Sequence, residues 1–84
     1  MDIGVEISLY PLNVDYIPAI KSFIERVNTY PRLKITTSSM STQIFGEYAD
    51  VMRVLERELA TSFERDGKCV FVMKVLEPFT PPGE

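Results

Sequence analysis

The spacing of apolar residues switches between two periods along the chain, and this switching restricts the possible fold more than any other feature. Over residues 3–10 apolar and polar residues alternate, which predicts a strand with one core face that Pro11 closes. Over residues 16–29 apolar residues recur at helical spacing. Asp15 is the expected N-cap of this helix, and Pro18 falls in its first turn, where its missing N–H does little harm.

The second half of the chain is predicted to contain three strands and one helix. Residues 33–39 (LKITTSS) follow Pro31 and are β-branched and polar, so they predict a strand; residues 42–46 predict another, joined to it as a hairpin. An i, i+4 rhythm predicts a helix over residues 48–66, with Gly67 just beyond its end. The apolar run over residues 68–76 (KCVFVMKVL) is typical of a strand covered on both faces.

The resulting order is β, α, β, β, α, β, which folds most economically as two right-handed βαβ halves. We therefore expect an α+β, ferredoxin-like sandwich: a four-stranded antiparallel sheet with both helices on one face. Residues 1–77 would form one domain, and the Pro-rich residues 78–84 a loose tail. The other sheet face would be bare, with Glu6, Ser8 and Tyr10 on it, joined by Val70 and Val72 if Lys74 also points there.

Several classes of function are excluded by what the sequence lacks. With no histidine among its 84 residues, it cannot build a Ser-His-Asp triad or a histidine-containing zinc site, and we expect no metal and no cofactor. A net charge of −3 with scattered basic residues gives no footprint for nucleic acid. No glycine-rich phosphate loop is present. The chemistry left open is that of carboxylates, because Glu6 or Asp15 could in principle act as a base.

The expected location is the cytoplasm. The single cysteine, Cys69, cannot form an intramolecular disulfide, and it is more typical of a buried, inert thiol than of a reactive one. No apolar stretch approaches the ~18 residues of a membrane span, and the first residues do not resemble a signal peptide. We therefore expect neither a membrane segment nor a secreted protein.

Two segments carry a resemblance to a known family. VEISLYPL (residues 5–12) and MSTQIFG (residues 40–46) resemble the opening strand and the hairpin strand of the YkoF-like family of thiamine-binding and hydroxymethylpyrimidine-binding proteins. The likeness extends over nearly the whole chain. It implies a ferredoxin-like, ACT-like domain that assembles into homodimers and often homotetramers and, in some members, binds thiamine or its pyrimidine precursor. Phe45 departs from the pattern, since the family often has Glu at this position.

The residues expected to bind a ligand are polar or aromatic side chains placed near the open side of the sheet: Glu6, Ser8, Tyr10, Thr36, Ser38 and Thr42. Glu6 would face a cationic thiazolium or a pyrimidine amino group, Tyr10 would stack on the heterocycle, and the hydroxyls would read its edge. Glu6 suits an exposed salt bridge equally well, and Ser and Thr are routine on solvated strands. The alternative location is the cleft between the helices and the sheet edge.

The function expected from these features is non-catalytic binding of thiamine or hydroxymethylpyrimidine by a homo-oligomer. The alternative is an ACT-like structural or regulatory module that responds to a different small ligand. An enzyme is the third possibility. A chain this short buries little more than ~60% of the surface of its unfolded form, which favours association with further copies.

Overall fold

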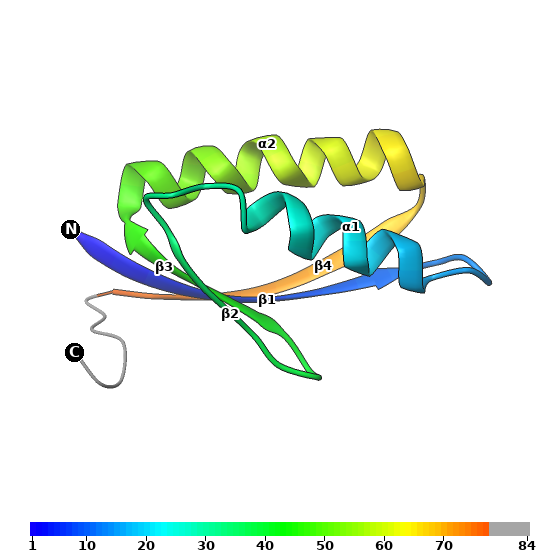
Figure 1. Ribbon diagram of the computed structural model, residues 1–84, viewed down its shortest axis with the longest axis horizontal. Helices are drawn as coiled ribbons and strands as arrows, with labels where there is room; N and C mark the ends of the chain where they lie inside the picture. Colours follow the sequence, from blue (N-terminus) through cyan, green and yellow to red (C-terminus); the bar gives the residue numbers. More distant parts are fainter. Residues whose placement is uncertain (78–84) are drawn as a thin grey trace.

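The computed structural model describes residues 1–77 and has the predicted order of elements. They are β1 (Asp2–Pro11), α1 (Ile17–Val27), β2 (Lys34–Thr37), β3 (Thr42–Glu47), α2 (Tyr48–Asp66) and β4 (Cys69–Leu76). The strands form one antiparallel sheet in the order β2-β3-β1-β4. Both helices cover the same face of it (Figure 1). The expected α+β, ferredoxin-like fold is thus confirmed, and the expected loose tail, residues 78–84, lies outside the described residues.

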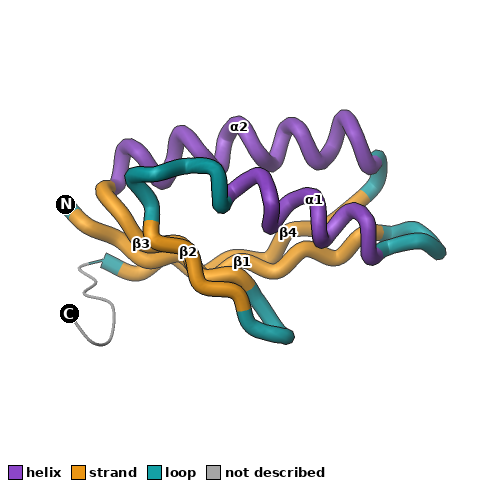
Figure 2. The backbone as a smooth tube through the Cα atoms, viewed as in Figure 1, coloured by secondary structure: helices purple, strands orange, loops and turns teal. Residues whose placement is uncertain are grey.

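The helices form one layer and the sheet a second, as Figure 2 shows, and the buried side chains of both layers make up the core. Its centre consists of side chains with almost no exposed surface, namely Ile3, Val5, Ile7, Val27, Ile44 and Val51. The odd-numbered β1 residues therefore point toward the helices, as the alternation over residues 3–10 predicts. A buried side chain of this size contributes ~1.5–3 kcal/mol. Burial of these faces holds the helices on the sheet.

The register of β1 with its neighbours fixes the composition of the open face. Glu6 lies opposite Lys74, Ser8 opposite Val72 and Tyr10 opposite Val70. Residues directly opposite one another in an antiparallel pair share a face. This confirms the predicted composition of the open face. Four of its side chains are large, apolar and about half exposed, and we call them the open-face strip: Tyr10, Val70, Val72 and Leu76.

The expectation that the last strand is covered on both faces is wrong. β4 is an edge strand, and its side chains alternate between half-buried and exposed from Cys69 to Lys74. Phe71 and Met73 pack against the core below α2, whereas Val70 and Val72 lie on the open face. A continuous apolar run does not distinguish a strand buried in the monomer from one that exposes half of its apolar side chains.

The ends of the helices agree with the sequence only for α2. This helix has the predicted bounds, and Gly67 follows it with a φ of 75°. α1 is shorter than residues 16–29, and its N-cap is Tyr16, without a side-chain cap, instead of the expected Asp15. Pro18 does lie in the first turn, as predicted. Within residues 1–77, no helix has both the length and the apolar character that a membrane span requires.

Candidate ligand-binding cleft

A cleft of about 390 Å³ opens at the end of the sheet where β1 extends beyond β3. Pairing of β1 with β3 stops at Ile7 and Thr42, because the chain then enters the β2–β3 turn, whereas β1 continues to Pro11 beside β4. The walls come from three places: residues 7–11 of β1, residues 38–42 of the turn, and Tyr16, Ile20, Phe23 and Ile24 at the start of α1. Its volume lies within the ~300–1,000 Å³ range of small-molecule sites.

The backbone of Leu9 gives this cleft a polar edge. In an antiparallel pair, successive residues of a strand direct their N–H and C=O alternately to one neighbour and to the other. The N–H of Leu12 donates to the oxygen of Lys68 on the β4 side, and the oxygen of Met1 accepts from Tyr48 on the β3 side. Odd-numbered β1 residues therefore direct both groups toward β3. β3 pairs with β1 only as far as Ile7, so no β3 residue lies opposite Leu9. The N–H and C=O of Leu9 therefore face the cleft.

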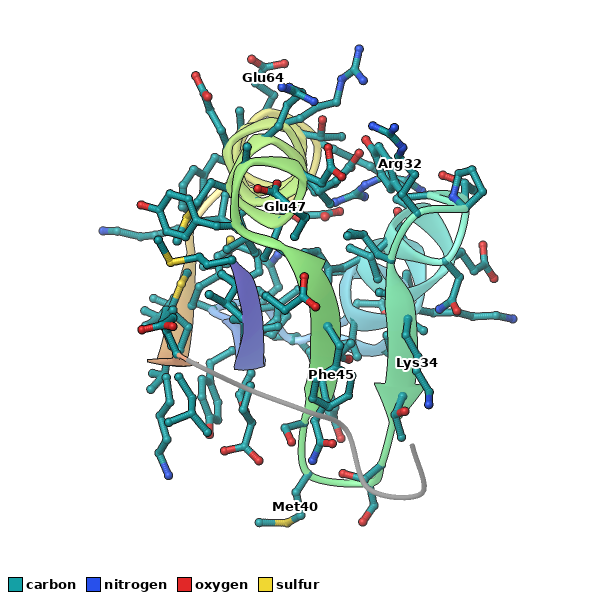
Figure 3. The ribbon with its side chains drawn as sticks, turned by 90° about the vertical axis from the view of Figure 1, so that its left-hand side faces the viewer. Arg32, Lys34, Met40, Phe45, Glu47 and Glu64 are labelled. Atoms are coloured by element: carbon teal, nitrogen blue, oxygen red, sulfur yellow. The ribbon has the colours of Figure 1, made fainter. Side chains whose placement is uncertain are left out.

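The side chains around Leu9 are mainly aromatic and aliphatic. Tyr10 and Tyr16 are about half exposed and stand at the mouth, while Phe23 forms buried floor. Met40 lies at the tip of the hairpin, as Figure 3 shows, and is 82% exposed. A flat heterocycle would find aromatic faces at the mouth and a donor–acceptor pair on the strand behind them.

Four of the six predicted ligand residues line the cleft, and two do not. Ser8, Tyr10, Ser38 and Thr42 are among its lining residues. Thr36 lies opposite Gln43 on the open face, and Glu6 lies opposite Lys74. The six residues therefore do not form one site on the open face.

Thr42 corrects the expected placement most clearly. It lies opposite Ile7, is 5% exposed and faces the helix side of the sheet. The hydroxyls of Ser8 and Ser38 are occupied by the turn: Ser8 donates to the oxygen of Met40 at 3.1 Å, and Ser38 accepts from two backbone N–H groups at 3.2 Å. These serines hold the hairpin beside β1, so they shape the cleft wall.

Glu6 is linked to the cleft through one neighbour. Its Oε2 accepts a hydrogen bond of 3.2 Å from the hydroxyl of Ser41, which is a lining residue, and its Oε1 lies 3.7 Å from Nζ of Lys74. The lysine partially neutralises the carboxylate, and the pair is well exposed to solvent. Glu6 is therefore placed to orient Ser41, and its charge is shared with Lys74.

Two functional candidates, Leu9 and Tyr16, were missed by reasoning from the sequence. The alternation over residues 3–10 predicts only that Leu9 lies on the core face, and its backbone role depends on where β3 ends. The helical spacing over residues 16–29 predicts only that Tyr16 begins a helix. The only usable signal was the pair of tyrosines flanking a Pro-containing loop, and that pattern is too common to identify a site.

Ionisable groups at the cleft are restricted to the tyrosines, as far as residues 1–77 are concerned. The lining residues include no carboxylate, amine or imidazole. In the same part of the chain, no group of three or more Cys, Asp or Glu side chains is arranged to hold a metal ion. The cleft therefore presents aromatic faces and hydrogen-bonding groups, and its lining residues include no charged side chain.

Comparison with known proteins finds one matching family. The model of the YkoF-related family matches residues 2–75. No curated protein matches the chain.

Solved structures with the same fold include protein SP2199 from Streptococcus pneumoniae, with a TM-score of 0.83, 20% identity, and coverage of 90% of this chain and 86% of that one. TM0486 from Thermotoga maritima, a candidate thiamine biosynthesis/salvage protein, has a TM-score of 0.81 and 17% identity, and 89% and 82% of the two chains are covered. MJ1052 from Methanocaldococcus jannascii has a TM-score of 0.79 and 22% identity, and the match covers 95% of this chain and 84% of that one. At these identities the likeness shows the fold.

Proposed function

The chain belongs to the YkoF-related family, and from this membership and the cleft we propose that it is a non-catalytic binding protein for thiamine or its hydroxymethylpyrimidine precursor, acting as a homo-oligomer. The observation that carries the proposal is the free backbone edge of Leu9 between two tyrosines. The description of the Thermotoga maritima protein as a candidate thiamine biosynthesis/salvage protein supports the choice of ligand.

The aminopyrimidine ring fits the polar edge of the cleft. It carries an amino donor next to a ring-nitrogen acceptor, which complements the C=O and N–H that Leu9 directs to the same side. Tyr10 and Tyr16 supply faces for stacking, and a thiazolium would gain a cation–π contact with either ring. Binding through the backbone is insensitive to side-chain identity, which accounts for the small number of polar side chains with free hydrogen-bonding capacity at the cleft.

No chemistry of its own is proposed for this site. General acid–base catalysis most often uses His, Asp, Glu or Lys, and the lining residues include none of these. Glu6 and Asp15, the carboxylates considered from the sequence, are both outside the lining. The protein would therefore deliver or sense its ligand unchanged, and a cytoplasmic location would suit a carrier with a free thiol.

Calorimetric titration with thiamine, thiamine phosphates and hydroxymethylpyrimidine tests the proposal. We expect wild type to bind at least one of them, and Tyr16→Ala to weaken binding about tenfold, the upper range of an aromatic contact. Glu64→Ala, a change at an exposed α2 residue that points away from the sheet in Figure 3, is the matched control and should bind as wild type does. Binding to none of these compounds would favour the regulatory module with a different ligand.

Glu6→Gln separates the two classes of ligand. Because Glu6 acts through Ser41 and shares its charge with Lys74, the change should weaken thiamine a few-fold and leave the neutral pyrimidine unaffected. Equal loss for both compounds would mean that the carboxylate positions the turn and has no electrostatic role toward the ligand.

A further inference from the structure

The basic residues of this chain are scattered along the sequence, but the fold gathers three arginines around one pocket. Arg32, Arg53 and Arg57 line a pocket of about 240 Å³ between α2 and the α1–β2 connection, residues 28–33. The other lining residues are Tyr30, Pro31, Leu33, Asp50 and Val54. Within residues 1–77, Asp50 is the one carboxylate of this lining, which therefore carries a net charge of +2 in a chain whose own net charge is −3.

This pocket is separate from the candidate ligand-binding cleft. The cleft lies at the start of α1, where Tyr16 lines it, whereas Tyr30 of the pocket follows the end of α1. The helix between them has 11 residues and is therefore ~16 Å long. Figure 3 is viewed from the end of the molecule that holds the pocket, and it shows Arg32 above the start of β2, on the side of α2. One small molecule does not reach both sites.

Asp50 holds two of the arginines together. Its Oδ1 lies 3.5 Å from a terminal nitrogen of Arg32 and 3.4 Å from a terminal nitrogen of Arg53. Arg32 belongs to the α1–β2 connection and Arg53 to α2, so the shared carboxylate brings guanidinium groups from both walls side by side. The Asp50 side chain is 20% exposed, whereas those of Arg32 and Arg53 are 78% and 71% exposed. The carboxylate thus lies beneath the two guanidinium groups, which stand at the mouth.

Arg57 brings a third guanidinium group to the same pocket. It follows Arg53 by four residues, so the two side chains are neighbours on the surface of α2. Burial and the hydrogen bond to Glu58 raise the pKa of Tyr30, and the Arg57 guanidinium opposes this rise. Arg57 therefore lies at the Tyr30 end of the pocket. Within residues 1–77, no carboxylate forms an ion pair with Arg57.

The pocket has an apolar floor and a charged mouth. Leu33 and Val54 are buried, and Tyr30 is partly buried. An anion above this floor is shielded from water on its inner side, which strengthens its attraction to the guanidinium groups. Among the described residues, no large apolar side chain of the lining is exposed, so the mouth has nothing that would insert into a lipid bilayer.

We infer that this pocket, the arginine pocket of Arg32, Arg53 and Arg57, binds the phosphate group of a small, soluble phosphate monoester. Such a group carries a charge of about −1.5 to −2 at pH 7, which balances the +2 of the lining. Guanidinium groups bind phosphate oxygens through paired N–H donors. The volume lies below the ~300–1,000 Å³ of sites for drug-sized ligands, so it suits a phosphate group with a small organic substituent.

A phosphate monoester fits these charges better than a carboxylate does. A carboxylate brings one negative charge and would leave the lining with one uncompensated positive charge. The phosphate ester would be a second ligand of the protein, bound at the opposite end of α1 from the cleft. The inference therefore does not rest on the proposed function or on association between copies of the chain.

NMR titration of the ¹⁵N-labelled protein with phenyl phosphate at low ionic strength gives the first test. We expect a Kd of about 1 mM, because the guanidinium groups are largely exposed, and at least tenfold weaker binding of benzoate. Backbone amide signals of residues 30–33 and 50–57 should shift, while those of residues 7–11 at the cleft should not. Inorganic phosphate should shift the same signals, because it carries the recognised group alone.

Arginine variants give the second test. Arg57→Gln should weaken phenyl phosphate at least tenfold, since it removes a charge-assisted hydrogen bond. Arg65→Gln removes the same charge from the same helix outside the pocket, and it should bind as wild type does. Because Arg57 also acts on Tyr30, Arg32→Gln on the opposite wall provides a second variant with the same expected loss. Thermal melts identify any variant that fails to fold.

Three results would overturn the arginine pocket. They are wild-type affinity in both Arg57→Gln and Arg32→Gln, benzoate binding as tight as that of phenyl phosphate, and shifts confined to the cleft. Sedimentation with phosphatidic acid vesicles tests the lipid source of the same group: binding to the vesicles without binding to phenyl phosphate would overturn a soluble ester. Loss of hydroxymethylpyrimidine binding in Tyr16→Ala should leave phenyl phosphate binding intact, so failure of the proposed function is distinguishable from failure of this inference.

Discussion

Every nitrogen of the Arg26 side chain donates a hydrogen bond, and two of the three, Nε and one terminal nitrogen, reach from α1 to α2. Its Nε donates to Oε1 of Glu58 at 2.7 Å, and its two terminal nitrogens donate to the hydroxyls of Ser22 and Ser62, each at 2.6 Å. Tyr30 donates to the other carboxylate oxygen of Glu58. Burial, followed by the bond to Glu58, raises the pKa of Tyr30. Because Glu58 is only 6% exposed, its charge depends on these partners.

Arg26→Ala should lower the free energy of unfolding by about 3–5 kcal/mol, since it leaves the buried carboxylate of Glu58 without its cation. Urea denaturation would measure the change. Arg53→Ala is the control, because Arg53 pairs with Asp50 on the surface and such pairs contribute only ~0.2–1 kcal/mol. Similar losses for the two variants would show that the Arg26–Glu58 pair contributes no more to stability than a surface ion pair does.

Cys69 is predicted to have a structural role. Burial, and to a lesser extent the charge of Asp66, raises the pKa of its thiol, so the reactive thiolate is scarce at neutral pH. Maleimide labelling of the native protein should be slower than labelling of the unfolded chain. Because the thiol pKa is raised, the folded protein keeps the Cys69 proton to a higher pH than the unfolded chain does. The stability that comes from this protonated thiol is complete below the ordinary pKa and is lost as the pH rises through the raised pKa.

Cys69→Ala should preserve binding and assembly and cost about 1 kcal/mol through lost packing. Rapid labelling of the native thiol, accompanied by loss of ligand binding, would contradict a structural role.

At the scale of single elements, the two ends of α2 are fixed by different means. The carboxylate of Glu47 accepts a hydrogen bond of 2.8 Å from the N–H of Ala49 at the first turn. Gly67 ends the helix with φ 75° and ψ −135°, a region that residues with a Cβ rarely adopt. A Cβ built there would meet no atom within 4 Å, so the constraint is conformational.

Gly67→Ala should therefore destabilise the protein by about 1–3 kcal/mol, the usual cost of such backbone strain. A synthetic chain with D-alanine at position 67 is the matched control, because a D-residue accepts positive φ and the site has room for the methyl group. Thermal unfolding should place the D-alanine protein near wild type. If L-alanine and D-alanine at position 67 destabilised the protein equally, the cause would be a steric contact of the methyl group and not backbone strain.

At the scale of the whole molecule, the open-face strip leaves apolar surface in water. Val70, Val72, Leu76 and Tyr10 are each about half exposed along β1 and β4. Contiguous apolar surface of this kind usually marks an interaction site, and a small chain gains most by covering it.

Val72→Glu should shift the assembly toward smaller species, because each copy would bring a carboxylate into an apolar contact. Light scattering at micromolar concentration would measure the mass. Thr36→Glu, which adds the same charge to the same face outside the open-face strip, should leave the mass unchanged. A monomeric wild type would remove the prediction altogether.

The fold could be read from the sequence because it depends on local patterns. Alternation at Ile3, Val5 and Ile7 and the i, i+4 rhythm at Val51 and Leu55 each specify an element and its buried face without reference to the rest of the chain. Once six elements are in order, chain connectivity leaves few topologies. Gly67 also ends α2 as predicted, because its conformation is a local requirement.

The candidate site depended on where distant segments stop pairing, and only the tertiary structure decided that. β3 turns away after Thr42 while β1 continues, which leaves the backbone of Leu9 free and forms the cleft beside Tyr16. The same register turns Thr42 toward the helices and sets Lys74 against Glu6. Strand order likewise made β4 an edge. Periodicity reports which residues share a face, but register and strand order arise from contacts between segments far apart in sequence, so they carry no local signal.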